Sequence, residues 1–501
     1  MISKKLGKLI IYFFSVTTLI LLFFNIFLTK DLPISSFHYF LLPNGITLLL
    51  GIFALGLFFW IIHKIDLKRI KINNSILEVA IFTLFFFFQL LFTYCTYSYV
   101  AWDPEVLWSF GLQINSGYEI DPSYFSTYPN NLLLLNIVVL IQRIASVLPK
   151  ELFFDYIYLF LIINCILNSI TGILIYKLIK SFCGKRTAWV GWAMYAALIG
   201  TSGWLDIYYS DSLTLIIPIS VGYIWSIGKK NIRFLFIGFL ALFGTYIKPQ
   251  CIIILIAIVM WEIISLFFSD WEKKKDTVKH VAFVVVGLLV GMLVAGLCKR
   301  TSFKIDEEAS FSPTHYLMMG LEGYGSYNLP DVEFSQSFAT KRERNSANLA
   351  EAANRVKAKG FDGMMKHIVG KALYNYHDGT FGFENITCSW FWRSDRTVEN
   401  PVAALLTNAV RGGGKIHLLT DCLRQAVWLA VMLFSGVFPF AFKRVKDKEI
   451  ECVSVFGLSL FGLFMFLMLF EARARYLYIY IPLYICISAI TINAIFKPEK
   501  D

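Results

Sequence analysis

Residues 76–105 have the sequence ILEVAIFTLFFFFQLLFTYCTYSYVAWDPE, a long apolar run that ends in two carboxylates. About 20 consecutive apolar residues are enough for an α-helix to cross the hydrocarbon core of a bilayer. This stretch therefore predicts a membrane-spanning helix over 76–98, with acidic side chains at the membrane boundary directly after it. Apolar runs of this kind recur along most of the chain, so this pattern decides the fold class.

The composition of the whole chain agrees with a membrane protein. Of its 501 residues 57% are hydrophobic, 17% aromatic and only 16% charged, and the mean hydropathy is +0.62. Soluble domains carry about 25% charged residues. These values exclude a cytosolic enzyme, a nucleic-acid-binding protein and a disulfide-stapled secreted domain. The net charge of +11 is interpreted as Lys and Arg gathered in cytoplasmic loops.

The apolar runs predict an all-α polytopic membrane protein with about 12 transmembrane helices, within a range of 11–13. The predicted spans are 9–29, 44–64, 76–98, 153–177, 188–205, 211–228, 232–247, 250–268, 280–298, 420–443, 450–470 and 476–496. With both termini in the cytoplasm, every predicted inner loop is basic, as the positive-inside rule requires. The abundance of Phe, Ile, Lys and Asn is typical of an AT-rich bacterial genome, which predicts a bacterial plasma membrane.

Residues 131–148 are apolar enough for a thirteenth span. Counting them as a span would move the basic loop at Lys185 and Arg186 to the outside, against the charge rule. We therefore expect this segment to stay on the outer side or to lie along the interface, where Arg143 suits an amphipathic helix.

Four parts of the chain follow from these spans. They are an N-terminal helix pair at 1–75, a catalytic membrane module at 76–299 with an outer loop at 99–152, an outer subdomain at 300–418, and three C-terminal helices at 419–501. Helical spacing recurs within the subdomain over 346–374. No internal repeat is present, so nothing favours the paired halves of many secondary transporters.

Carboxylates at the predicted outer boundary are the first candidate site residues. Asp103 and Glu105 follow a span directly, and the pKa of a carboxylate near hydrocarbon tends to rise, which suits a general acid or base. The structural alternative is a helix start, with Asp103 as N-cap and Pro104 at the first helical position. Asp211, between the fifth and sixth spans, is a third candidate, with helix capping again the alternative.

Tyr128, Asn130 and Asn131 form a second candidate group, at the start of the apolar segment 131–148. An aromatic residue followed by Pro129 is typical of an interfacial belt. The paired amides need hydrogen-bond partners, and a sugar or a phosphate could supply them.

Cations placed against the charge rule are the third group. Lys248 lies in a very short outer turn, and Arg473, Arg475 and Tyr476 open the last span. Arg binds phosphate with two parallel hydrogen bonds. Because Glu471 can neutralise only one of the two arginines, we expect an anion site here.

The long outer loop adds weaker candidates, His315 and Arg393, for substrate binding. A lone His is more often a structural hydrogen-bonding group, and the tryptophans that flank Arg393 could face lipid instead of a sugar. The glycine run at 412–414, between Arg411 and Lys415, lacks the spacing of a P-loop. No Cys or His spacing indicates a metal site.

Taken together, these motifs resemble the GT-C superfamily of integral-membrane glycosyltransferases, and within it the branch of protein O-mannosyltransferases and the lipid A aminoarabinose transferase. The matching features are Asp103 with Glu105, the segment 124–131, Asp211, Lys248 and Arg475 with Tyr476. The chain departs from the family pattern in that Pro104 separates the two acidic residues, and two spans precede the usual first one.

The resemblance implies an inverting transfer of a sugar from a polyprenyl-phosphate donor to an extracytoplasmic glycan, lipid or protein acceptor. It implies Asp103 as general base, with Glu105 or Asp211 orienting a substrate. Lys248, Arg473 and Arg475 would hold the phosphate. No cofactor is required, although the carboxylates could hold a divalent metal. The partners are then the donor, the acceptor and the lipid bilayer, and no nucleic acid.

Two other functions remain open from the sequence. A flippase for lipid-linked saccharides would need the same phosphate-binding cations, and a glycopolymer polymerase would also carry a large outer loop. The gathering of charged residues on one face, with few at mid-membrane depth, favours the transferase.

Overall fold

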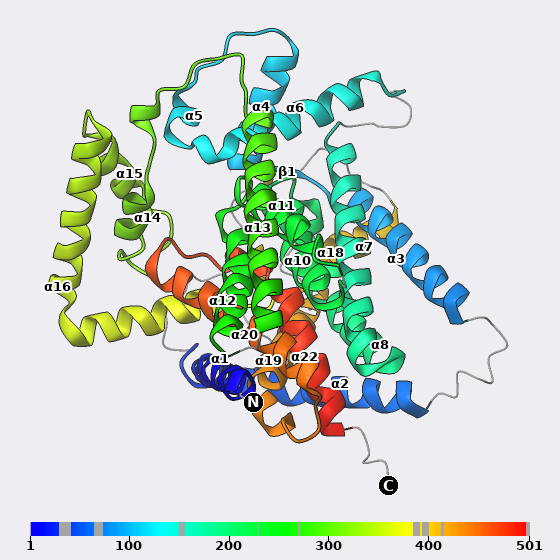
Figure 1. Ribbon diagram of the computed structural model, residues 1–501. Coiled ribbons are helices and arrows are strands. Elements are labelled where there is room, and N and C mark those ends of the chain that lie inside the picture. The colour runs from blue at the N-terminus through cyan, green and yellow to red at the C-terminus, as the bar shows by residue number, and fades with distance from the viewer. Residues whose placement is uncertain are drawn as a thin grey trace.

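The computed structural model describes residues 2–29, 42–64, 74–149, 156–228, 230–268, 271–383, 391–392, 400–411 and 415–496. It is an all-α polytopic membrane protein, as predicted (Figure 1). In the described part of the chain the extended structure is one antiparallel pair of two-residue strands, β1 (Tyr99–Val100) and β2 (Phe391–Trp392). This pair joins the end of the first-quoted span to the long loop.

Ten helices of the described residues are long and apolar enough to cross a membrane: Lys5–Phe27, Asn44–Lys64, Ser75–Thr96, Pro129–Val147, Tyr156–Cys183, Ser210–Ile227, Pro249–Phe267, Lys274–Cys298, Ile416–Gly436 and Asp447–Leu469. Nine of them fall on predicted spans. The predicted spans 232–247 and 476–496 form shorter apolar helices, Arg233–Thr245 and Ile481–Phe496. The tenth candidate, Pro129–Val147, is the segment that we expected on the outer side.

The helices that build the bundle are α1 (Ile2–Phe27), α2 (Asn44–Lys64), α3 (Asn74–Thr96), α7 (Tyr156–Cys183), α8 (Lys185–Tyr195), α10 (Ile216–Ile227), α11 (Arg233–Thr245), α12 (Ile252–Phe268), α13 (Trp271–Cys298), α19 (Lys415–Gly436), α20 (Asp447–Leu469) and α22 (Ile481–Phe496). Helix α22 lies at the centre and packs on α7, α8, α10, α19 and α20. Every side chain from Ile481 to Ile492 is buried. A helix that is apolar on all sides is expected in such a position.

Helices at the periphery expose apolar side chains instead. Phe53 is 68% exposed on α2, and Leu84 is 68% exposed on α3. Where α11 meets α13, small residues allow close contact: a Cβ placed on Gly287 would lie 2.1 Å from the backbone oxygen of Leu235. Lipid-facing apolar surfaces and glycine at helix contacts are both typical of membrane bundles.

Helices α3 and α7 are antiparallel neighbours, which decides the path of the chain between them. The Tyr158 hydroxyl donates to the Leu90 backbone oxygen at 2.8 Å, and Lys180 pairs with Glu78 at 2.7 Å. The end of α3 therefore lies beside the start of α7, so the chain between them leaves and returns on one face of the bundle. We call this the site face.

Three helices lie in that connection: α4 (Asp103–Asn115), α5 (Ser123–Thr127) and α6 (Leu132–Val147). The side-chain amide of Asn136 on α6 donates to the backbone oxygens of Cys298 and Arg300, at the C-terminal end of α13. Helix α6 thus crosses the end of a spanning helix, and α4 to α6 lie together at that end of the bundle (Figure 1). The path from α3 to α7 through α6 therefore begins and ends on the same face of the bundle.

The predicted span 188–205 is wrong as a continuous helix. Helix α8 ends at Tyr195, a π-helical turn (η3) covers Ala196–Gly200, a 3-10 turn (η4) covers Gly203–Asp206, and α9 covers Ser210–Thr214. Side chains of neighbouring helices bind the freed backbone: Gln89 donates to the oxygen of Gly200, and Asn164 to those of Leu205 and Ile207. Irregular backbone at membrane depth persists only where it is satisfied in this way.

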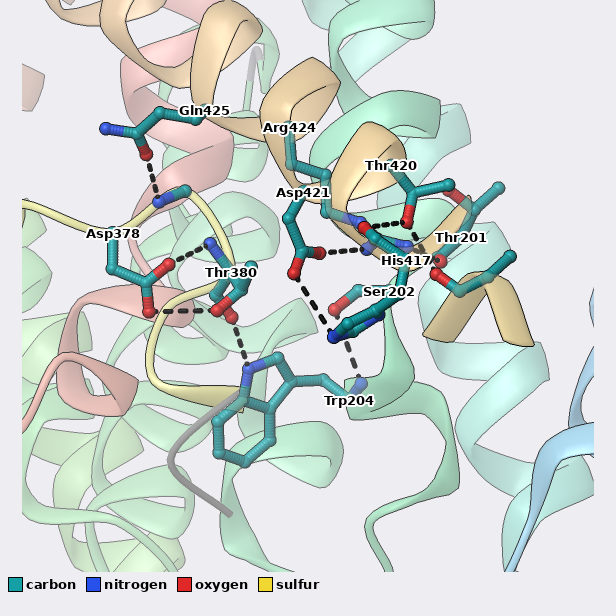
Figure 2. Close-up of polar contacts among 12 residues, drawn as sticks. Thr201, Ser202, Trp204, Asp378, Thr380, His417, Thr420, Asp421, Arg424 and Gln425 are labelled. Carbon is teal, nitrogen blue, oxygen red and sulfur yellow. Dashed lines mark hydrogen bonds and ion pairs between the residues drawn. The ribbon is translucent and has the colours of Figure 1, made fainter. Parts of the chain in front are cut away.

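A buried polar cluster holds the same unwound segment from its other side (Figure 2). Arg424 of α19 pairs with Asp421 and donates to the backbone oxygen of Thr201 at 3.0 Å. The indole nitrogen of Trp204 donates to the backbone oxygen of Thr380 at 3.1 Å. Asp378 closes the turn that carries Thr380 by accepting from its backbone nitrogen and hydroxyl. The cluster thereby positions the segment that leads into Asp206 and Asp211.

The long loop folds as a helical subdomain. Among the described residues it contains α14 (Pro313–Met319), α15 (Leu329–Gln336), α16 (Lys341–Tyr376) and α18 (Pro401–Val410), and one 3-10 turn, η6 (Glu307–Ala309). The helical spacing expected over 346–374 corresponds to α16, which begins with a Thr340–Glu343 capping box and kinks at Gly360. The subdomain returns to the site face, where the backbone nitrogen of Ala472 donates to the oxygen of Gly325 at 2.7 Å.

Candidate active site

Asp103 is the carboxylate at the centre of the site. It is the first residue of α4, and Trp102 is the N-cap, so the expectation that Asp103 caps the helix and Pro104 begins it is off by one position. The Asp103 side chain accepts a hydrogen bond from the Tyr124 hydroxyl at 3.0 Å and another from the Tyr209 hydroxyl at 2.9 Å. A carboxylate offers about four acceptor positions, so it can still accept a proton from a third group.

Both tyrosines remain protonated donors. Burial raises the pKa of Tyr124, and the nearby Asp103 charge raises it further. Burial likewise raises the pKa of Tyr209, again with help from Asp103. The amide of Asn131 donates to the Tyr124 hydroxyl at 2.8 Å, and Asn130 donates to Asn131 at 3.2 Å. The predicted amide pair therefore holds the Tyr124 hydroxyl, which in turn donates to the Asp103 carboxylate.

Arg475 faces this carboxylate from the start of the last span. Its guanidinium carbon lies 4.5 Å from the ring centre of Trp102. It also lies 5.6 Å from the ring centre of Tyr209 and 5.4 Å from that of Tyr476. Burial opposes its charge, while Tyr476 and the carboxylates of Asp211 and Asp103 raise the pKa of Arg475. The result is a permanent cation enclosed by aromatic faces.

Lys248 does not act as a free cation. Its ammonium lies 2.7 Å from Asp211 Oδ1, and the two side chains are 4% and 0% exposed. Burial lowers the pKa of Lys248, while Asp211 works in the opposite direction. Asp211, expected among the catalytic carboxylates, and Lys248, expected to bind a phosphate, thus neutralise each other. Lys248 also lies over the Tyr476 ring at 4.7 Å.

Several buried polar atoms of this region have no hydrogen-bond partner among the described residues. They are Trp102 Nε1, Asp211 Oδ2 and Arg475 Nε. Buried polar atoms are nearly always satisfied in folded proteins, by protein, by water or by a ligand. Three such atoms around one carboxylate are what a polar ligand site would leave.

Other predicted residues lie at the rim or away from the site. Glu105 is exposed on α4 and points to solvent. Arg473 pairs with Glu471 at 3.7 Å and is 38% exposed. Tyr128 is half-buried, and its ring meets that of Phe311 at 5.5 Å. Arg393 lies outside the described residues.

His315 has a structural role. Its ring stacks on Phe311 at 3.9 Å and its Nδ1 lies 2.7 Å from the Ser335 hydroxyl. Burial lowers the pKa of His315 to about 4. The side chain is therefore neutral at pH 7. It packs against Phe311, which in turn contacts Tyr128.

The sequence did not single out Tyr124, Tyr209 or Trp102 as site residues, although all three belong to motifs that it singled out. Tyr209 stands between two candidate carboxylates, and Tyr124 opens the aromatic segment before Pro129. Tyrosines are so frequent at membrane interfaces that their spacing alone carries no signal for a site.

A second buried ion pair involves Asp206 of the unwound segment. Arg411 donates to Asp206 at 3.1 Å, where Asp206 is 0% and Arg411 14% exposed, and Arg411 also contacts Ser98. This contact ties the end of α18 to the unwound segment.

Metal-ligating side chains do not gather in the part of the chain that the structure describes: no three His, Cys, Asp or Glu residues there lie close enough to hold an ion. The candidate site consists of the Asp103 carboxylate, the Arg475 guanidinium and the aromatic rings between them, with the Lys248–Asp211 pair beside Tyr476.

Comparison with known proteins places the chain only broadly. A family model described as "Conserved hypothetical integral membrane protein" matches residues 2–496. No curated protein and no solved structure matches the chain. The match covers both the bundle and the loop subdomain.

Proposed function

This chain belongs to the family of conserved hypothetical integral membrane proteins, and we propose that it is a glycosyltransferase that moves a sugar from a polyprenyl-phosphate carrier to an acceptor hydroxyl. The observation that carries the proposal is the pairing of a base and an anion-binding cation in one site. Tyr209 donates to Asp103 and also stacks near the Arg475 guanidinium.

The chemistry of such a transfer assigns a role to each group. Asp103 takes the proton of the acceptor hydroxyl, while Tyr124 and Tyr209 orient its carboxylate. The acceptor oxygen bonds to the anomeric carbon, the bond from that carbon to the phosphate oxygen breaks, and polyprenyl phosphate leaves as an anion. Arg475 stabilises the charge that develops on the phosphate. A single displacement of this kind inverts the anomeric centre.

The position of the site suits a lipid-linked donor. Trp102 and Tyr476 beside Arg475 belong to segments that join spanning helices at the site face. A phosphate on a polyprenyl chain travels at that depth in the bilayer. From the distribution of Lys and Arg, we propose that the site face is extracytoplasmic in a bacterial plasma membrane and that both termini are cytoplasmic.

The loop subdomain stands where an acceptor would approach. Its backbone pairs with residues next to Arg473, and its Phe311 backs Tyr128 at the rim. We propose that it selects the acceptor, whether a cell-wall glycopolymer, a lipid or a surface protein.

The test uses the purified chain in liposomes with a panel of radiolabelled polyprenyl-phosphate sugars and a cell-envelope extract as the acceptor source. We expect one sugar to leave its carrier, measured as free polyprenyl phosphate, with label appearing in the extract. Arg475→Ala should weaken donor binding, so that a higher donor concentration is needed for the same rate of release.

The same experiment separates the flippase alternative. The unwound segment between α8 and α9 is the feature that favours it, since broken helices often line transport sites. Labelled lipid that crosses the bilayer without losing its sugar would replace the transferase proposal by a flippase. Release that occurs only in the presence of extract supports the transferase.

A further inference from the structure

A cavity of about 270 Å³ lies away from Asp103, where α6 crosses the C-terminal end of α13. Arg143 and Arg300 line it together with the hydroxyls of Thr301 and Ser302. Leu140 and Phe303 complete the wall with apolar surface. Cations, hydroxyls and an apolar side in one small cavity form a binding surface for an anion that carries a hydrocarbon chain.

The two arginines are available to such an anion. Arg143 Nε donates to the amide oxygen of Asn115 at 2.8 Å, which holds the side chain in place without neutralising it. Neither Arg143 nor Arg300 pairs with a carboxylate in the ranges that the structure describes. Asn136 donates to the backbone oxygens of Cys298 and Arg300, so part of the negative end of α13 is already occupied.

An apolar stripe leads away from the cavity along α6. Leu140, Ile144 and Val147 are 57%, 46% and 81% exposed, and their spacing places them on one side of the helix. Leu293 and Leu297, near the end of α13, are 64% and 51% exposed. A helix with an exposed apolar stripe beside cations is typical of one that lies in the membrane interface.

We propose that this cavity binds the phosphate headgroup of a membrane phospholipid, with its acyl chains along the stripe of α6. The cavity, at about 270 Å³, has room for a phosphate headgroup, and its open side leads to the apolar stripe. Binding holds the α4–α6 unit against α13, and α4 carries Asp103 in its first turn. The proposal is independent of the proposed reaction.

Native mass spectrometry of the delipidated full chain tests the proposal. The probes are dioleoyl phosphatidylglycerol, dioleoylglycerol without the phosphate, and inorganic phosphate. Arg143→Gln combined with Arg300→Gln should weaken binding of the phospholipid about tenfold or more, since two charge-assisted contacts are lost. The matched control, Arg342→Gln combined with Lys357→Gln, removes two exposed cations of α16 and should bind as the wild type does.

Each result has one meaning. Phosphatidylglycerol binding that the cavity variant weakens and the control keeps supports the site. Equal binding of dioleoylglycerol, or unchanged phospholipid binding in the cavity variant, overturns it. Inorganic phosphate that binds as tightly as the lipid would make the cavity a site for a free anion instead. The arginine pair can be tested in an Arg475→Ala background, so the outcome is separate from that of the proposed donor site.

Discussion

Asp103→Asn is expected to lower the rate of sugar transfer by about 100-fold to 10,000-fold, the range over which general bases contribute. The substitution keeps the size of the side chain. Tyr124 and Tyr209 donate to different oxygens of Asp103, so the single amide oxygen of Asn can still accept from one of them. It removes the group that takes the acceptor proton. Donor binding should survive, because Arg475 is unchanged. The measurement is the release of polyprenyl phosphate beside a separate titration of donor binding.

Glu105→Gln is the matched control for this prediction. It removes the neighbouring carboxylate by the same chemical change. Glu105 lies two residues after Asp103 on α4 and is exposed. We expect it to keep near-normal transfer. The sequence left both carboxylates open as the base, so near-normal transfer by Asp103→Asn with loss in Glu105→Gln would reverse the assignment.

Lys248→Met is expected to lower the free energy of unfolding by about 3–5 kcal/mol, the usual cost of removing one partner of a buried ion pair. Met matches the length of the Lys stem, so packing changes little. The loss arises because Asp211, which is 0% exposed, stays buried without its cation. Thermal or chemical unfolding in detergent measures the effect.

The double variant Lys248→Met with Asp211→Leu shows whether the pair or the individual side chains matter. With both charges gone, most of the stability should return, since apolar replacement of a buried pair is often neutral. If Lys248→Met is as stable as the wild type, the two side chains are not paired in the membrane. If the double variant is no more stable than Lys248→Met, the loss of stability arises from altered packing and not from the unpaired charge.

The fold could be predicted to the extent that it depends on hydropathy. Spans such as 44–64 require only enough consecutive apolar residues, and that number can be counted directly in the sequence. The span 188–205 was wrong because its continuity depends on partners: Gln89, Asn164 and Arg424 supply hydrogen bonds to the unwound backbone. Those donors lie on three other helices, so the sequence of residues 196–206 does not identify them.

The sequence predicted which charged residues belong to the candidate site, but not which of them pair with each other. Asp103 and Arg475 stood out because charged side chains are costly at the membrane boundary. Lys248 stood out for the same reason, yet it neutralises Asp211, which precedes it by 37 residues. Sequence alone cannot separate a cation that waits for a ligand from one that already has a carboxylate.

Hydrophobicity, loop charge and the position of ionisable residues are one-dimensional properties, and from them the sequence by itself determined a polytopic helical bundle and the side chains worth testing. Tertiary structure alone decided which of those side chains meet. It brought Tyr124 and Tyr209 to Asp103, enclosed Arg475 in aromatic rings and paired Lys248 with Asp211. The reason is physical: hydrogen bonds and ion pairs act over a few ångströms, and only packing brings residues hundreds of positions apart within that range.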